Sequence, residues 1–374
     1  MTSIGFVTQD WSFATDSPSL GGAGHYRLAI PAAALAAQGY DVSLGALIGA
    51  KVNGSRHPAL GVLPPHLMEA EREEQLAAAS WPDVLVMQRV MLVDVIEHVR
   101  EARLAGQRIV QDIDDWFGGL PTSNRAFQAT HVSRNAEANV SHYFGVLAAS
   151  DLVIASTPYL AERVERRCGR PTVVCRNAID LDRWTIERPQ REPPVLGWVG
   201  ALTHRAYDLE QLRGLLGQVL GHGYAERFHH SGWSPFTKSA AVRLGLPHDA
   251  VTTVGMASIE DYPHLLKFFD VCVVPLDLIP FNRAKSAIKG MEYAASSIPF
   301  VASASDEYRY LHDEYGIGRV ALRTKDWLRH LRELADPEVR AKEARVQRER
   351  VAALDIKRRW HDWAEVLESV VPTA

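Results

Sequence analysis

Lys285, Ser286, Lys289 and Glu292 lie close together in the sequence, and their side chains are of the types that bind phosphate and sugar groups. Two ammonium groups and a hydroxyl can neutralise and hydrogen-bond a diphosphate. Glu292 follows Ser286 by six residues and Lys289 by three, and its carboxylate can accept a hydrogen bond from a sugar hydroxyl. The group predicts a nucleotide-sugar pocket. The alternative is an ordinary solvated helix face on which Lys289 pairs with Glu292.

A strand and a helix must position these side chains. The apolar run Val271 to Pro275 indicates a buried strand. Apolar residues then recur at helical spacing from about Arg283 to Ser297, and Pro299 to Ala302 indicates the next strand. Ligands of such parallel units bind at the carboxyl ends of the strands, and a helix start favours an anion. The phosphate-binding side chains are therefore expected in the first two turns of this helix.

The stretch FNRAKSAIKGMEYAASSIPFVAS, residues 281–303, resembles the donor-binding signature of glycosyltransferases with the GT-B fold, especially the family-4-like "group 1" enzymes. The closest subgroup has the pattern FN..KS..K..EY....IP.VAS. The resemblance implies that Glu292 holds the ribose of the nucleotide and that the helix start holds the diphosphate. It also implies that the donor is contacted by Asn282, Ser286, Ala287 and Lys289.

Composition limits the class of protein. A chain of 374 residues with 47% hydrophobic and 23% charged residues is expected to form two soluble α/β domains. The net charge of −4 gives no basic field for nucleic acid or an anionic membrane. The N-terminus lacks the features of a signal peptide, and no apolar run is long enough to span a membrane. The three cysteines are expected to be reduced thiols, so a cytoplasmic location is predicted.

The first strand, Ile4 to Val7, leads to a glycine-rich loop and an alanine-rich helix. Backbone without side chains can approach a phosphate closely at such a loop. The loop resembles the first loop of GT-B enzymes, which implies that Gly21, Gly22 and Arg27 contact the donor phosphate. A flexible surface loop is the alternative.

A cluster of carboxylates, Asp112, Asp114 and Asp115, follows a strand predicted at Arg108 to Gln111. Its position at a strand end suggests acceptor binding or proton transfer by Asp114 or Asp115. A solvated turn is one alternative, and a metal site of the Asp-x-Asp type used by glycosyltransferases of the GT-A fold is another. The GT-B resemblance implies a metal-independent reaction, because these enzymes stabilise the leaving diphosphate with helix dipoles and basic side chains.

The stretch DLVIASTPYLAERV…VVCRNAIDLDRW resembles the end of the N-terminal GT-B domain. Asn177 and Asp180 are expected in structural roles at the domain junction, with direct ligand contact as the alternative. A charged, proline-rich linker follows. The next strand ends at Gly200, and in the related enzymes the loop after it opens the donor site. Gly200, His204 and Arg205 are therefore expected near the diphosphate, with capping of the next helix as the alternative for His204. His229 and His230 alternate faces of a predicted strand, so they are not expected to chelate a metal.

The predicted architecture is α/β, with two Rossmann-like domains facing a cleft. The expected segments are an acceptor domain at 1–184, a linker at 185–194, a donor domain at 195–354 and a C-terminal helix at 355–374. This helix carries Trp360 and Trp363, and the GT-B resemblance implies that it crosses back and packs on the first domain.

The predicted function is transfer of a hexosyl group from a nucleotide diphosphate sugar to an acceptor hydroxyl, with retention of configuration implied by the resemblance. Lys285 and Arg205 are assigned to the leaving diphosphate, and Asp114 and Asp115 to acceptor or proton. No cofactor is expected. The acceptor stays open between a glycan, a lipid, a small molecule and a protein, and the oligomeric state is open too.

Three alternatives remain. Many members of the family carry a second glutamate eight residues before the one at Glu292, where this chain has Ala284, so a nucleotide-sugar-binding protein without catalysis is one of them. Asn282 or Phe281 is otherwise expected to substitute in part. A GT-B-fold epimerase is the second, although the acid and base groups it needs are not evident. Modification of DNA is the third, and the charge balance argues against it.

Overall fold

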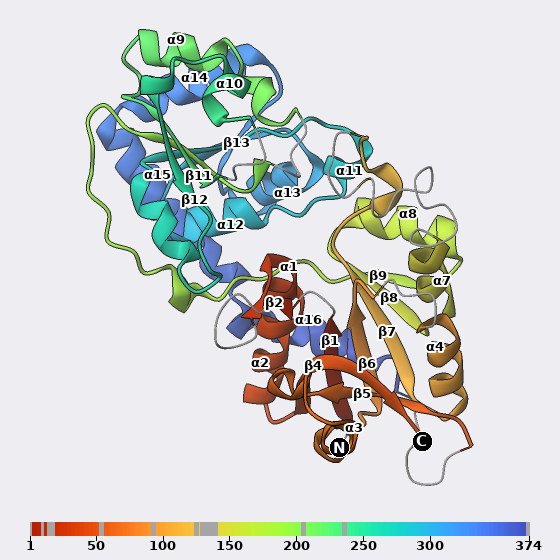
Figure 1. Cartoon of the computed structure of the whole chain (residues 1–374). Coiled ribbons are helices and arrows are strands. Elements are labelled where there is room, and N and C mark those ends of the chain that lie inside the picture. The colour runs from red at the N-terminus through yellow and green to blue at the C-terminus, as the bar shows by residue number, and fades with distance from the viewer. Residues whose placement is uncertain are drawn as a thin grey trace. The chain divides into compact units, whose positions relative to one another are not determined.

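The computed structural model describes residues 2–8, 11–12, 19–51, 56–90, 95–122, 127, 141–202, 207–233 and 238–371. The chain forms two compact units (Figure 1). Unit 1 comprises Met1–Gly118, Gln128–Ala178 and Ile356–Ala374, and unit 2 comprises Gly119–Phe127 and Ile179–Asp355. Among the described residues, no helix has the length and apolarity needed to cross a membrane.

Unit 1 is built on a sheet whose strands lie in the order β5-β4-β1-β6-β7-β8-β9. All neighbours are parallel except β4 and β5. The strands are β1 (Ser3–Thr8), β4 (Asp41–Ala50), β5 (Ala59–Leu63), β6 (Val84–Gln88), β7 (Arg108–Ile113), β8 (Leu152–Ala155) and β9 (Thr172–Val174). A short antiparallel pair, β2 (Trp11–Ser12) and β3 (Ser19–Leu20), stands apart from this sheet.

Helices cover both faces of the unit 1 sheet. Successive strand residues point to opposite faces, so apolar residues on each face can pack against helices. Val7, Leu85 and Met87 pack with α4 and α7. Phe6 points the other way and meets Trp363 of α16, which packs against α2. The helical segments are α1 (Gly22–Gly24), the π-helix η1 (His25–Ala29), α2 (Ile30–Ala37), η2 (Pro65–Leu67), α3 (Arg72–Ala78), α4 (Val95–Leu104), η3 (Phe117–Gly119), α7 (Ser141–Ala149), α8 (Pro158–Cys168) and α16 (Ile356–Glu368).

Unit 2 has a parallel sheet in the order β12-β11-β10-β13-β14-β15. Numbered within the unit, this is 3-2-1-4-5-6, the order of dinucleotide-binding folds, whose ligands bind where the order reverses. That place lies at the carboxyl ends of β10 and β13. The strands are β10 (Leu196–Val199), β11 (Phe228–Trp233), β12 (Val251–Gly255), β13 (Val271–Val274), β14 (Phe300–Ser303) and β15 (Arg319–Ala321).

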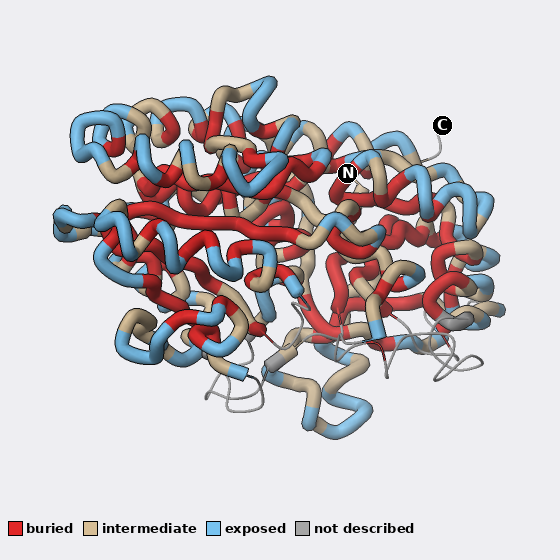
Figure 2. The backbone as a smooth tube through the Cα atoms, turned by 90° about the horizontal axis from the view of Figure 1, so that it is seen from above, coloured by how far each residue is buried: buried red, intermediate tan, exposed pale blue. Residues whose placement is uncertain are grey.

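One face of the unit 2 sheet buries Trp198, Phe228 and Val273 against η7, α9, α10 and α14. The other face carries α12, where a β-carbon at Gly290 would lie 2.8 Å from the ring of Phe300. In Figure 2 the buried stretches of the tube lie mostly inside and the exposed stretches mostly on its outer turns. The helical segments are η5 (Leu181–Trp184), η7 (Leu209–Leu212), α9 (Leu215–Gly221), α10 (Ala240–Leu244), η8 (His248–Ala250), η9 (Tyr262–Phe268), α11 (Pro280–Arg283), α12 (Ile288–Ala295), α13 (Asp306–Tyr315), α14 (Thr324–Ala335), α15 (Pro337–Arg350) and η10 (Val351–Leu354).

The main segment of unit 2 begins at Ile179, six residues before the linker expected at 185–194. The physical reason is that this segment lies against unit 2. Arg183 donates to the carbonyl of Ile259, and Arg188 donates to the carbonyls of Phe269 (2.7 Å) and Ser297 (2.6 Å). The proline-rich composition therefore marks a segment packed on unit 2.

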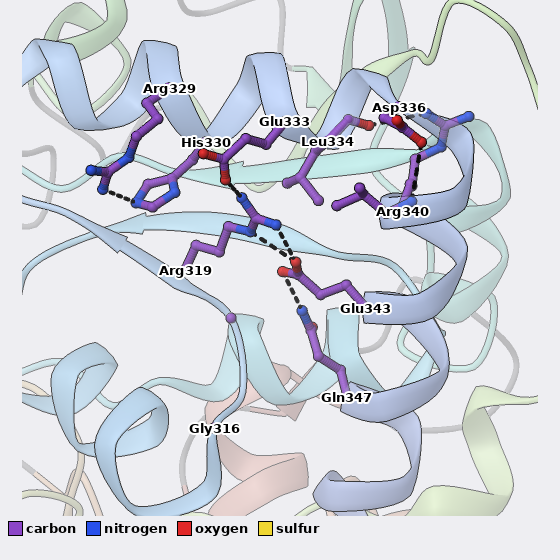
Figure 3. A network of polar contacts seen from close by, with 12 residues as sticks. Gly316, Arg319, Arg329, His330, Glu333, Leu334, Asp336, Arg340, Glu343 and Gln347 are labelled. Atoms are coloured by element: carbon purple, nitrogen blue, oxygen red, sulfur yellow. Dashed lines mark hydrogen bonds and ion pairs between the residues drawn. The ribbon is translucent and has the colours of Figure 1, made fainter.

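Polar contacts join the last strand of unit 2 to the two helices that follow it (Figure 3). The guanidinium of Arg319 in β15 forms ion pairs with Glu333 of α14 and with Glu343 of α15, the latter at 2.6 Å. Gln347 donates to Glu343 at 3.1 Å. One half-buried cation thus holds the strand and both helices together.

Candidate functional site

The turn after β10 lies at the point where the strand order of unit 2 reverses. Gly200 has a φ of +148°, and Gly232, near the end of β11, has a φ of +106°. A β-carbon at Gly232 would lie 2.7 Å from the carbonyl oxygen of Gly200, so the two loops touch backbone to backbone. His230 Nε2 donates to the same oxygen at 3.0 Å. This close packing requires glycine at both positions and fixes the backbone at the sheet edge.

The loop after β13 is held by a buried amide. Asn282 Nδ2 donates to Asp208 Oδ1 (2.7 Å) and to the carbonyl of Asp277 (2.8 Å). The backbone N–H of Asp277 donates to the same Asp208 oxygen at 3.0 Å. Both hydrogens of the Asn282 amide are therefore engaged by the protein. Asn282, expected to contact the donor, shapes the loop in this structure.

The helix predicted from about Arg283 begins only at Ile288, as α12, whereas Arg283 is the last residue of the short helix α11, so the predicted start is wrong. A turn separates them, in which the N–H of Lys285 donates to the carbonyl of Asn282 at 3.2 Å. Apolar spacing is the same for one helix or two, so periodicity could not find the break. Lys285 and Ser286 therefore precede α12, and the ammonium of Lys285 lies 4.1 Å from the ring centroid of Phe281. Ala287 is the N-cap residue, with no side-chain cap on the helix.

Lys289 and Glu292 lie in α12, one turn apart. The Nζ atom of Lys289 lies 3.5 Å from where a β-carbon at Gly200 would stand, so the ammonium reaches the end of β10. Glu292 is 3% exposed, and one of its oxygens, Oε2, accepts a hydrogen bond from the hydroxyl of Tyr262 at 2.7 Å. Tyr293 accepts from the N–H of Val199 at 3.4 Å and ties the helix to the same strand end. The cation and the carboxylate thus come from one helix, whereas the glycine turn comes from a segment far away in the sequence.

The two adjacent histidines lie on opposite faces of β11, as predicted from strand alternation. His229 stacks on Phe268 with ring centroids 4.8 Å apart, and His230 stacks on Trp198 at 5.3 Å. Burial, reinforced by the neighbouring His230, lowers the pKa of His229 from 6.5 to about 4. Burial also lowers the pKa of His230. Both rings are therefore neutral packing groups at physiological pH.

In unit 1, Arg27 occupies a buried network. Its guanidinium is 1% exposed and pairs with Asp112, which is fully buried, with the closest N–O distance 2.5 Å. Nη1 donates to the carbonyl of Cys175 (2.8 Å) and to Asn177 Oδ1 (2.9 Å), and the ring of Trp363 lies 4.9 Å away. Arg27 therefore joins η1, β7, the chain after β9 and α16. Such burial leaves no open face for the donor phosphate that the resemblance assigned to it.

The ion pair with Arg27 engages Asp112, one of the two carboxylates of the alternative metal site at Asp112 and Asp114. Both carboxylate oxygens of Asp112 accept hydrogen bonds from Arg27. Burial raises the pKa of the Asp112 carboxyl, and the adjacent guanidinium opposes that rise. Among the described residues, no group of three or more His, Cys, Asp or Glu side chains has a metal-binding arrangement.

The remaining predicted residues of unit 1 are more open. Gly21 and Gly22 are exposed, and a β-carbon at either would meet no atom within 4 Å, so the fold itself does not require glycine there. Asp114 and Asp115 follow β7 and are half-buried, and the buried Tyr143 donates to the carbonyl of Asp115 at 3.4 Å. His204 and Arg205 lie outside the described residues.

Sequence reasoning missed Tyr262 and Asp208, which hold Glu292 and Asn282. Each is separated from its partner by 30 residues or more. Neither stands in a motif, so only the tertiary structure could find them.

No family model matches the sequence, and no curated protein matches it. Solved structures resemble the whole chain. Sucrose-phosphate synthase from Thermosynechococcus elongatus has a TM-score of 0.62 and 18% identity, with 99% of each chain covered. HepE from Anabaena, in complex with UDP and glucose, has a TM-score of 0.64 and 14% identity, covering 99% of this chain and 100% of its own. A glycosyltransferase from Rickettsia africae has a TM-score of 0.65 and 11% identity, covering 100% and 99%.

Two domains, each built on a mainly or wholly parallel sheet and together spanning the chain, are the architecture of the compared enzymes. The chain has the GT-B fold.

Proposed function

We propose that this protein transfers a glycosyl group from a nucleotide diphosphate sugar to an acceptor hydroxyl. The observation that carries the proposal is that α12 holds both the buried Glu292 and Lys289, whose ammonium reaches Gly200 at the reversal point of the unit 2 sheet. A cation and a helix start serve a diphosphate there, and a carboxylate serves the ribose. HepE, whose fold is similar, was solved with UDP and glucose.

In the proposed donor complex, the diphosphate lies at the start of α12, which has no side-chain cap. Ser286, Ala287 and Lys289 contact it. Lys285 and Arg205 offset the negative charge that grows on the diphosphate as the bond from its oxygen to the anomeric carbon breaks. Gly200 lies in the same region. His204 is the further donor-binding residue that the resemblance implies. Glu292 accepts a hydrogen bond from a ribose hydroxyl.

The acceptor oxygen forms the new bond to the anomeric carbon and loses its proton in the same step. Asp114 and Asp115, at the carboxyl end of β7, are our candidates to bind the acceptor or take that proton. Gly21 and Gly22 are proposed to contact the donor phosphate. We propose a retaining, metal-independent reaction on a hexosyl donor in the cytoplasm. These points rest on the resemblance and the composition of the sequence.

A thermal-shift panel of UDP, GDP, ADP and dTDP, each with and without Mg²⁺, tests the proposal. Binding to the folded state raises the melting temperature by mass action, so we expect a selective rise with one nucleotide. We expect the rise to be unchanged by Mg²⁺. Equal melting temperatures with all four nucleotides would count against a donor pocket at Glu292.

A binding protein without catalysis is the second candidate, and one observation favours it. Ala284 stands at the position of the family's second glutamate, so this chain has no carboxylate there. The Ala284 side chain is fully buried. Hydrolysis of the donor sugar, or its transfer to any member of an acceptor panel, separates the two candidates. Tight binding of the nucleotide sugar with no turnover would support the binding protein.

A further inference from the structure

The Glu292 carboxylate is held by a side chain from another part of unit 2. Tyr262 is the first residue of η9, between β12 and β13, whereas Glu292 lies in α12, after β13. The Tyr262 hydroxyl donates to Glu292 Oε2 at 2.7 Å, the length of a strong bond to a carboxylate. Glu292 itself is 3% exposed.

Tyr262 is in turn held by the segment through which the chain enters unit 2. The ring of Trp184, in η5, meets the Tyr262 ring edge to face, with centroids 6.0 Å apart and planes at 90°. Trp184 is 2% exposed. The neighbouring Arg183 donates to the carbonyl of Ile259, three residues before Tyr262. The hydroxyl is therefore fixed by packing from η5.

A glutamate has three rotatable side-chain bonds, so its carboxylate direction is poorly defined unless something holds it. A hydrogen bond to Oε2 fixes the plane of the group and so the direction of the other oxygen, Oε1. We infer that Tyr262 is a positioning residue, which orients the Glu292 carboxylate toward a ribose hydroxyl, and that Trp184 maintains it. This inference rests on the proposed function.

The test is titration calorimetry of Tyr262→Phe, which keeps the ring against Trp184 and removes only the hydroxyl. The ligands are the nucleoside diphosphate with the largest thermal shift in the panel and its 2′,3′-dideoxy analogue. We expect the Kd of the ribose nucleotide to rise about 3- to 10-fold, as for a lost hydrogen bond, and the Kd of the analogue to change less than about 2-fold. Trp184→Phe should change the Kd of each ligand in the same direction as Tyr262→Phe does, by a smaller factor.

Two further variants make the result decisive. Tyr224→Phe, at a half-buried tyrosine elsewhere in unit 2, should leave both affinities unchanged. Glu292→Ala is the reference, and combining it with Tyr262→Phe should add no further loss, because the two residues act through one carboxylate.

The outcomes are separable. If Glu292→Ala weakens the binding of the ribose nucleotide and Tyr262→Phe does not, the positioning role of Tyr262 is overturned and the proposed function stands. Equal weakening of both ligands by Tyr262→Phe would mean a general structural role and would also overturn it. If Glu292→Ala leaves the ribose nucleotide unaffected, the donor site itself is misplaced.

Discussion

The ammonium of Lys289 lies 3.5 Å from the point where a β-carbon at Gly200 would stand, so a helix residue and a strand-end glycine define one corner of the site. The same β-carbon would lie 3.1 Å from the ring of Trp198. Glycine is required here for two reasons: the space is filled, and the φ of +148° is unfavourable for other residues.

Gly200→Ala should therefore destabilise unit 2 by about 1–3 kcal/mol and weaken nucleotide binding, because the turn must shift away from Lys289. Urea unfolding and the thermal-shift panel measure the two effects. Gly255→Ala is the matched control, since a β-carbon there meets no atom within 4 Å. Equal behaviour of the two variants would show that the turn after β10 tolerates a side chain.

Glu292→Ala should weaken the binding of the preferred nucleotide by about 1–3 kcal/mol, the value of a hydrogen bond to a charged group. Calorimetry measures the change, and Glu314→Ala on the exposed surface of α13 is the control. An affinity equal to that of the wild type would refute the role assigned to Glu292.

Arg27→Met should destabilise unit 1 by about 3–5 kcal/mol, because it leaves the carboxylate of Asp112 buried without its ion-pair partner. Replacing Asp112 by Leu in the same chain should recover part of the loss. Chemical denaturation of the single and double variants checks this. A stable Arg27→Met protein that no longer responds to any nucleotide would instead restore the phosphate contact expected from the sequence.

Stability should fall as the pH drops from about 6.5 to about 4. Burial lowers the pKa of His229 to about 4, so between these values the unfolded chain binds a proton that the folded chain excludes. This stability is fully present above pH 6.5, and at most about 3 kcal/mol of it is lost by pH 4. His229→Phe, which can still stack on Phe268, should lose less over this range. Parallel acid profiles of the two proteins would contradict the assignment.

Arg319→Met should cost about 1–2 kcal/mol, because the half-buried cation joins β15 to both α14 and α15 (Figure 3). The control is Arg227→Met, at an ion pair whose partners are 45% and 42% exposed. Exposed pairs contribute little, so the control should change stability by less than about 0.5 kcal/mol. Equal losses of stability in Arg319→Met and Arg227→Met would show that the Arg319 network stabilises the protein no more than an exposed ion pair does.

Much of the α/β pattern and the segment that forms the site could be predicted from local sequence. Strand alternation and apolar runs depend on neighbouring residues, so Val271 to Pro275 and Pro299 to Ala302 were recognisable as strands, as β13 and β14 confirm. The motif from Phe281 to Ser303 pointed to the GT-B fold that the comparisons show. The late start of α12 at Ile288 was not predicted, because Ala284 in the preceding turn stands at helical spacing from Ile288 in the sequence.

Periodic elements and chemically competent side chains could thus be predicted from the sequence, because both are encoded within a few residues. The folded structure was needed to show which of these side chains are engaged by the protein itself. Arg27 and Asn282 carry the polar groups expected of ligand contacts, yet partners about 75 to 150 residues away engage them. Glu292 depends in the same way on Tyr262. Long-range hydrogen bonds of this kind leave no periodic signal, since they require only that the folded chain bring the two groups together.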